Sequence, residues 1–210
     1  MIIAIDGPAA AGKGTLARRI AKEFDFAYLD TGALYRAVGL SLLKQGIAPT
    51  DEAAAEAASA ALDMALMDDP ALRAEATGSA ASQVAAMPKV RANLLDFQKN
   101  FALNPPDGAP GAVLDGRDIG TVVCPDADLK LFVTASAEVR AERRLKEMQE
   151  RGIAADFDAI LADVKARDER DMGRKDAPLK PAEDAHLLDT SNLDIDAVFL
   201  RAAAFVKERL

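Results

Sequence analysis

The chain has 210 residues, half of them hydrophobic, which suffices for one packed domain and is unlike a disordered chain. Its net charge of -8 argues against a nucleic-acid binder, because such proteins usually carry a basic balance or a basic face. The single cysteine, Cys124, excludes an internal disulfide, and no apolar run is long enough to predict a membrane span. We expect a soluble cytoplasmic protein in which Cys124 is a buried structural thiol.

The first half of the chain alternates short apolar runs with helical patterns. Residues 2–6 and 27–30 are near-continuous apolar runs, as in strands that are buried on both faces of a parallel sheet. Helical spacing follows at 14–24, 34–43, 51–67 and 78–101, with Pro88 as a point where the last helix can break.

The second half continues this alternation after a loop at 104–111 that is rich in proline and glycine. Further strands are predicted at 112–115, 129–133 and 186–189, and further helices at 136–151, 156–171 and 195–210. The only histidine, His186, falls in the last strand, where we expect a structural role. Strands that alternate with helices predict an α/β fold of three layers around a central parallel sheet.

A glycine-rich loop stands between the first strand and the first helix. Its residues are Gly7, Pro8, Ala9, Ala10, Ala11, Gly12, Lys13, Gly14 and Thr15. The spacing matches the P-loop, in which backbone N–H groups and the positive end of the following helix bind the phosphates of a nucleotide. Lys13 is expected to reach the β- and γ-phosphates as a movable point charge. The loop therefore predicts the P-loop NTPase fold and an ATP site.

This loop departs from the general pattern at one position. Gly14 occupies the place of the Ser or Thr that usually holds Mg²⁺, and Thr15 follows one residue later. We therefore assign no metal ligand among the side chains. The form Gly-Lys-Gly-Thr is found in nucleoside monophosphate kinases of the adenylate kinase type. A regulatory GTPase is much less favoured, since the chain also lacks an Asn-Lys-x-Asp stretch for reading guanine.

Arginines and aspartates recur near the predicted strand ends, where open α/β sheets bind ligands. Arg117 and Asp118 directly follow the strand at 112–115, and Arg143 and Arg144 lie on a charged helix. A kinase for small phosphates must neutralise two polyanions that approach each other, and this distribution of arginines suits that demand.

Five stretches together resemble the bacterial cytidylate kinases, the CMP/dCMP kinases among the P-loop nucleoside monophosphate kinases. They are Ile5-Asp6-Gly7-Pro8 with Gly12-Lys13-Gly14-Thr15; Leu29 to Arg36; Ala81-Ser82-Gln83-Val84-Ala85 with Pro88 to Arg91; Asp115-Gly116-Arg117-Asp118-Ile119-Gly120-Thr121-Val122-Val123; and Arg167-Asp168-Glu169-Arg170-Asp171 with Arg174 and Ala177-Pro178-Leu179. The stretches cover nearly the whole chain in order, and the last two are far more specific than the P-loop.

The resemblance implies a role for each matching side chain. The CMP phosphate would be held by Thr31, Arg36, Arg91 and Arg117, with Asp118 near the phosphates. The cytosine would be read by Ser82, Arg91 and Arg167, and the sugar hydroxyls would be bound by Asp171 with the help of Arg174. The ATP phosphates would be covered by Arg143 and Arg144. Lys13, Arg117 and Asp118 are the catalytic candidates. The implied cofactors are ATP and Mg²⁺, the implied substrates are CMP and dCMP, and the implied state is a monomer.

The resemblance also divides the chain into three functional parts. The core would comprise residues of about 1–40, 104–140 and 182–210, with a small NMP-binding insert at 41–103 and a helical lid at 141–181. Many members of the family carry a small β-sheet in the insert, but here 51–77 is short and rich in alanine. We therefore expect a reduced, mostly helical insert. The alternative that stays open is a P-loop kinase for another small acceptor, such as UMP or a shikimate-like molecule.

Overall fold

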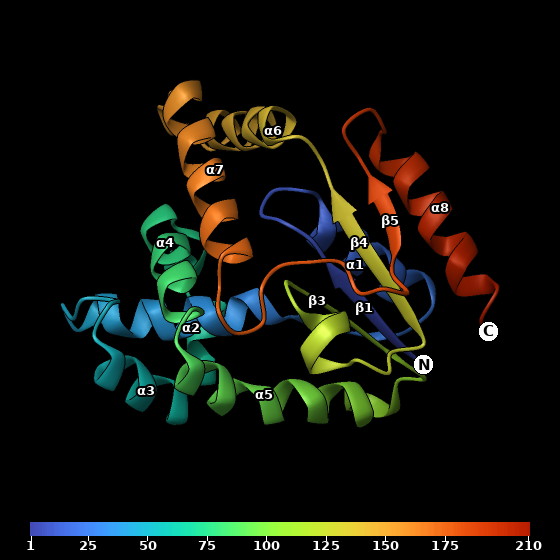
Figure 1. The fold of residues 1–210 in the computed structure, drawn as a ribbon, viewed down its shortest axis with the longest axis horizontal. Coiled ribbons are helices and arrows are strands. Elements are labelled where there is room, and N and C mark those ends of the chain that lie inside the picture. Colours follow the sequence, from blue (N-terminus) through green and yellow to red (C-terminus); the bar gives the residue numbers. More distant parts are fainter.

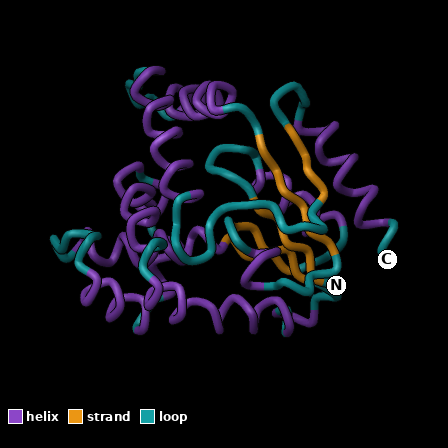
Figure 2. Tube along the Cα trace, viewed as in Figure 1, coloured by secondary structure: helices purple, strands orange, loops and turns teal.

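The computed structural model describes residues 1–210 as a five-stranded, wholly parallel sheet with helices on both faces (Figures 1 and 2). The strand order is β2-β3-β1-β4-β5. The strands are β1 (Ile2–Asp6), β2 (Ala27–Asp30), β3 (Ala112–Gly116), β4 (Leu129–Thr134) and β5 (His186–Asp189). All five predicted strands and the α/β fold are confirmed.

Eight α-helices and four shorter helical turns connect and cover these strands. The α-helices are α1 (Lys13–Glu23), α2 (Thr31–Lys44), α3 (Glu52–Ala60), α4 (Glu75–Val84), α5 (Pro88–Leu103), α6 (Ala137–Glu150), α7 (Phe157–Met172) and α8 (Ile195–Lys207). The turns are η1 (Met64–Asp68), η2 (Pro70–Arg73), η3 (Pro106–Gly108) and η4 (Ile119–Val123), of which η4 is a π-helix and the others are 3₁₀-helices. No helix is both long and apolar enough to cross a bilayer.

Different helices pack on the two faces of the sheet. Leu16 and Ile20 of α1 and Val198 and Val206 of α8 pack on one face, against the β1 side chains that include Ile3. On the other face, α5 and η4 pack against Ala4, Leu29 and Leu114, and the buried Cys124 belongs to this cluster. Burial raises the pKa of the Cys124 thiol to about 11, which agrees with a structural thiol.

Helices α2 to α5 form a lobe beside the carboxyl ends of the strands, and α6 and α7 form a second, smaller one (Figure 1). Within this lobe, residues 41–103 contain no strand, as we predicted for a mostly helical segment. The prediction of one helix over 51–67 is wrong, because α3 ends at Ala60. Asp63 accepts a hydrogen bond from the Ala65 N–H and starts a separate 3₁₀ turn there, a competition typical of aspartate within helical sequence.

Other boundaries shift less. The break at Pro88 is real, since α4 ends at Val84 and α5 begins at Pro88. Helix α2 begins at Thr31 rather than at 34, because the Asp30 carboxylate caps it by accepting from the Ala33 N–H at 3.1 Å. His186 lies in β5 with its ring stacked on Phe205, 4.0 Å between centroids, which fits the expected structural role.

Candidate active site

The P-loop connects β1, the central strand, to the N-terminus of α1. Gly7 has φ +148, and a Cβ there would lie 1.9 Å from the Val133 carbonyl oxygen, so only glycine fits. Gly12 has φ +93 and precedes α1 without capping it through a side chain. The first N–H groups of α1 have no acceptor within the helix and no acidic residue in the first turn, which is the arrangement that binds an anion.

Lys13 lies buried at the first turn of α1. Burial, and then the nearby Arg117 guanidinium, lower the pKa of its amine to about 8. Asp115, at the end of β3 and next to β1, is also buried, and burial raises the pKa of its carboxyl. It accepts a hydrogen bond from the Tyr28 hydroxyl at 3.0 Å. The structure thus places a cation and a carboxylate directly behind the phosphate loop.

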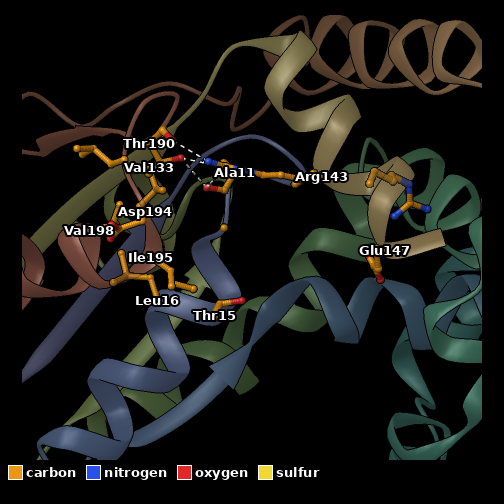
Figure 3. Close-up of a pocket in the computed structure, with 14 residues that line it drawn as sticks. Ala11, Thr15, Leu16, Val133, Arg143, Glu147, Thr190, Asp194, Ile195 and Val198 are labelled. Atoms are coloured by element: carbon orange, nitrogen blue, oxygen red, sulfur yellow. Dashed lines mark hydrogen bonds between the residues drawn. The ribbon is translucent and has the colours of Figure 1, made fainter. Parts of the chain in front are cut away.

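A cavity of about 480 Å³ opens on the outer side of the P-loop (Figure 3). Its walls combine the loop, the start of α1, helix α6 and the connection from β5 to α8, and they include Ala11, Gly12, Thr15, Leu16, Val133, Arg143, Arg144, Glu147, Thr190, Leu193, Ile195 and Val198. Half of the lining side chains are hydrophobic. An apolar cavity that ends on an anion-binding loop suits a ligand with a flat base and a phosphate tail.

Arg143 and Arg144 both line this cavity, but Arg143 is already engaged. Its guanidinium donates to the Thr190 hydroxyl at 3.0 Å and to the Thr190 carbonyl at 2.6 Å. The Thr190 hydroxyl lies within hydrogen-bond distance of the Ala11 carbonyl, at 3.2 Å, and of the Thr134 carbonyl, at 3.1 Å. Arg143 also donates directly to the Ala11 carbonyl at 3.4 Å, so these contacts join α6, the β5–α8 connection and the P-loop (Figure 3). In this structure Arg143 therefore orders the wall of the cavity.

A second cavity lies on the inner side of the P-loop, against the lobe of α2 to α5. All nine side chains predicted to bind substrate line it, namely Thr31, Arg36, Ser82, Arg91, Arg117, Asp118, Arg167, Asp171 and Arg174. They come from the ends of β2 and β3, from α2, α4, α5 and α7, and from the segment after α7. Residues spread over 144 positions of the chain (31 to 174) therefore meet in one place.

Ion pairs organise this second cavity. Arg117 Nε donates to Asp171 at 2.8 Å, Arg174 pairs with the same carboxylate, and Arg91 pairs with Asp118. Burial opposes ionisation of Asp171, but Arg117 and Arg174 hold the pKa of its carboxyl below the ordinary value. These pairs fix both arginine forks and carboxylates before any ligand arrives.

Two further arginines line the cavity, and nearby carboxylates compensate their positive charges less fully. Arg36 donates to the Leu72 carbonyl at 3.2 Å, and Arg167 pairs with Asp163 at 2.9 Å. Burial and the neighbouring Arg167 lower the pKa of Arg36, and burial lowers that of Arg167. Gly78 lets the two guanidinium groups approach, since a Cβ there would lie 3.0 Å from Arg36 and 3.3 Å from Arg167. Two adjacent cations of this kind favour a polyanionic ligand.

The two hydroxyl candidates are held differently. Thr31 is buried and its hydroxyl donates to the Asp115 carbonyl at 2.7 Å. Ser82, on α4, accepts from Arg170 Nε at 3.3 Å at a partly open edge of the cavity. Thr31 therefore lies deep beside the strand ends, and Ser82 lies toward the lobe.

The structure also reveals residues that our sequence reasoning missed. Asp6 is buried at the end of β1, Arg140 is buried between α6, α7 and the P-loop, and Thr190 joins Arg143 to Ala11. Asp6 had a signal, because a charged residue ended an otherwise apolar strand. Arg140 and Thr190 had none, since a charge on a polar helix and a hydroxyl after a strand are common.

Comparison with known proteins agrees with this geometry. A family model for cytidylate kinase matches residues 3–208. The chain belongs to the cytidylate kinase family. A cytidylate kinase of Paramagnetospirillum magneticum is 60% identical over 98% of this chain and 97% of its own length, and one of Brucella suis is 58% identical over 100% and 94%. A crystal structure of an uncharacterized protein from Eubacterium ventriosum has the same fold, with a TM-score of 0.58 at 12% identity over 100% of this chain and 99% of its own.

Proposed function

We propose that this cytidylate kinase family member transfers the γ-phosphoryl group of ATP to CMP or dCMP and releases ADP with CDP or dCDP. The observation that carries the proposal is the second cavity. Nine side chains of the kinds that bind phosphate, sugar and a polar base converge there beside a P-loop. A kinase for a nucleoside monophosphate needs such an acceptor site next to its donor site.

ATP would occupy the P-loop and the outer cavity. The backbone of residues 7–15 and the N-terminus of α1 would bind the β- and γ-phosphates, and Lys13 would pair with the γ-phosphate. The apolar walls at Leu193, Ile195 and Val198 would take the base. Arg143 and Arg144 would contribute charge from α6, with residues 141–181 acting as a lid over the donor.

Magnesium would accompany ATP in this site. Mg²⁺ prefers oxygen ligands and usually keeps phosphate and water around it, with only one or two carboxylates from the protein. The Asp115 carboxylate, which acts electrostatically on Lys13, and the Thr15 hydroxyl at the start of α1 would offer oxygen atoms to the ion. When bound, the ion would neutralise charge on the β- and γ-phosphates.

The acceptor would lie in the inner cavity, under the insert at 41–103. Thr31, Arg36, Arg91 and Arg117 would bind its phosphate, and Asp118 would orient Arg91 near that phosphate. Ser82, Arg91 and Arg167 suit the donor and acceptor edge of cytosine. Asp171, with Arg174 beside it, would accept hydrogen bonds from the sugar hydroxyls. The core at 1–40, 104–140 and 182–210 would hold both nucleotides at fixed separation.

Phosphoryl transfer then needs positioning and charge more than covalent chemistry by the protein. An oxygen of the CMP phosphate attacks the γ-phosphorus in line, and no general base is required because that phosphate is already ionised. Lys13 and Arg117 stabilise the charge that spreads over the transferring group. Closure of the lid excludes water and so limits hydrolysis of ATP.

The same proposal covers the setting of the enzyme. A net charge of -8, with seven arginines lining the two cavities, suits small anionic nucleotides rather than nucleic acid or a membrane surface. We propose a cytoplasmic enzyme that acts as a monomer, since both cavities are complete within one chain.

The test is a coupled assay of ADP release with a panel of acceptors, namely CMP, dCMP, UMP, AMP and shikimate, each with and without Mg²⁺. We expect rapid turnover with CMP and dCMP, and much weaker turnover with the others. Vigorous turnover of UMP, AMP or shikimate together with failure of both cytidine nucleotides would refute the proposal.

A further inference from the structure

A carboxylate lies buried at the end of the central strand, one residue before the P-loop. Asp6 is only 4% exposed, and its neighbours along β1 are the fully buried Ile3, Ala4 and Ile5. Burial raises the pKa of its carboxyl to about 6, although hydrogen bonds from Gly120 and Ile119 act in the opposite direction. A buried charge is expensive unless strong hydrogen bonds satisfy it. The buried Asp6 carboxylate therefore requires compensating hydrogen bonds.

Those hydrogen bonds come from η4, which is distant in sequence. Asp6 accepts hydrogen bonds from the backbone N–H groups of Ile119 and Gly120, both at 2.7 Å. These are the first two residues of η4, and the first N–H groups of a helix have no acceptor within it. The adjacent Asp118 does not cap η4, because its side chain pairs with Arg91. Asp6 thus caps η4 from another element.

Asp6 also contacts the segment just before η4, at the end of β3. Asp6 pairs with Gly116 in the register of β1 and β3, so the chain leaves Asp6 at Gly116 and returns to its carboxylate at Ile119. Arg117 and Asp118 are the only residues between the two anchor points. Gly120 permits the close return, since a Cβ there would lie 3.3 Å from the Asp6 carboxylate and 3.1 Å from the Lys130 side chain.

We propose that Asp6 is a positioning residue for phosphoryl transfer, which holds the Arg117–Asp118 turn in place against the strand that carries the P-loop. The inference rests on the proposed function and adds a residue that lines neither the donor cavity nor the acceptor cavity. Arg117 reaches Asp171 and Asp118 reaches Arg91 from this turn, so its displacement would move the acceptor cavity relative to the donor loop. Misplacement of about 1 Å can reduce a rate by about 100-fold.

The test is the kinetics of Asp6→Asn, which keeps the shape but turns one acceptor into a donor that faces an N–H group. We expect kcat/KM for CMP to fall by about 10- to 100-fold, with KM for ATP within about twofold of the wild type. Gly120→Ala presses on the same contact from the η4 side without touching the P-loop, and it should give the same pattern. Circular dichroism and thermal unfolding establish that each variant is folded.

Asp128→Asn provides the matched control. Asp128 also accepts from a backbone N–H of β1, that of Ile2 at 2.6 Å, but it does so at the opposite end of the strand. It should leave both KM values within about twofold of the wild type. Wild-type kinetics for CMP in both Asp6→Asn and Gly120→Ala would overturn the inference, and so would an Asp6→Asn effect confined to KM for ATP.

The two proposals fail separately in this design. The acceptor panel with wild-type protein tests the proposed function alone. The ratio of variant to wild-type kcat/KM, measured with whichever acceptor the wild type uses, tests the role of Asp6.

Discussion

The donor loop works through its backbone, whereas the acceptor cavity works through side chains. The P-loop is nine consecutive residues whose glycines shape the chain, with one charged side chain, Lys13. The acceptor cavity draws charged side chains from several elements and pairs most of them with each other, as in Arg117 with Asp171. The contrast shows that one half of the site is fixed by local chain geometry and the other by the packing of the whole fold.

The largest expected effect comes from removing the one charge of the donor loop. Lys13→Met should lower kcat/KM by a factor that corresponds to about 2 to 4 kcal/mol of transition-state stabilisation, because a preorganised charge at the transferring phosphoryl group is lost. The ligand-free variant should be at least as stable as the wild type, since burial already lowers the pKa of this amine to about 8. Steady-state kinetics and urea unfolding measure the two effects. Lys22→Met, an exposed site on the same helix, serves as the control, and a clear loss of stability in Lys13→Met would contradict the second expectation.

An effect of the same size is expected from the acceptor half. Arg117→Ala should also cost about 2 to 4 kcal/mol in kcat/KM for CMP, because it removes a cation at the acceptor phosphate and leaves Asp171 with Arg174 as its only partner. KM for ATP should change little. Arg201→Ala on the exposed side of α8 is the control, and near wild-type turnover of CMP by Arg117→Ala would remove Arg117 from the mechanism.

A pH series examines the junction of the two halves at Asp6. Its pKa is about 6 in the folded protein, against about 3.8 when unfolded, so the folded state holds this proton more tightly. The stabilisation by that proton is fully present below pH 3.8 and disappears as the pH rises through 6. The free energy of unfolding of the wild type should therefore fall relative to Asp6→Asn by about 2 kcal/mol between pH 4 and pH 7. Urea unfolding of both proteins across that range measures the difference, and a difference that does not vary with pH would be inconsistent with this pKa.

The smallest expected effect concerns the wall of the donor cavity. Thr190→Val removes a hydroxyl that accepts from Arg143 and lies near the Ala11 and Thr134 carbonyls, and it should raise KM for ATP by up to about tenfold, or about 1.4 kcal/mol. KM for CMP should stay constant, because Thr190 does not line the acceptor cavity. If both KM values rose together, the two halves would be less independent than the geometry indicates.

The contrast between the halves also explains what could be predicted from sequence. The strands were predictable because they are continuous apolar runs, and the P-loop was predictable because its residues are consecutive. Among the acceptor residues, Arg117 and Asp118 could be placed from their position after a strand. The others could be named only through resemblance to a family, since no local pattern shows that they meet. The end of α3 at Ala60 was missed because alanine-rich sequence favours helix until the Asp63 side chain competes for a backbone N–H.

Residues that act on other protein groups were the hardest to predict. Asp6, Arg140 and Thr190 act through contacts to the backbone of distant segments, and such contacts depend on which strands are neighbours. The strand order β2-β3-β1-β4-β5 brings β1 between β3 and β4, and this order follows from packing rather than from any one stretch of sequence.

The lowered pKa of Lys13 has a chemical consequence beyond catalysis. With a pKa of about 8, roughly a quarter of these amines are uncharged at pH 7.5, whereas an exposed lysine with a pKa near 10.4 is almost wholly protonated. An uncharged amine is a nucleophile. Lys13 is therefore the lysine of this chain best suited to covalent capture, by a reagent that carries an acylating or sulfonylating group on a phosphate-like tail.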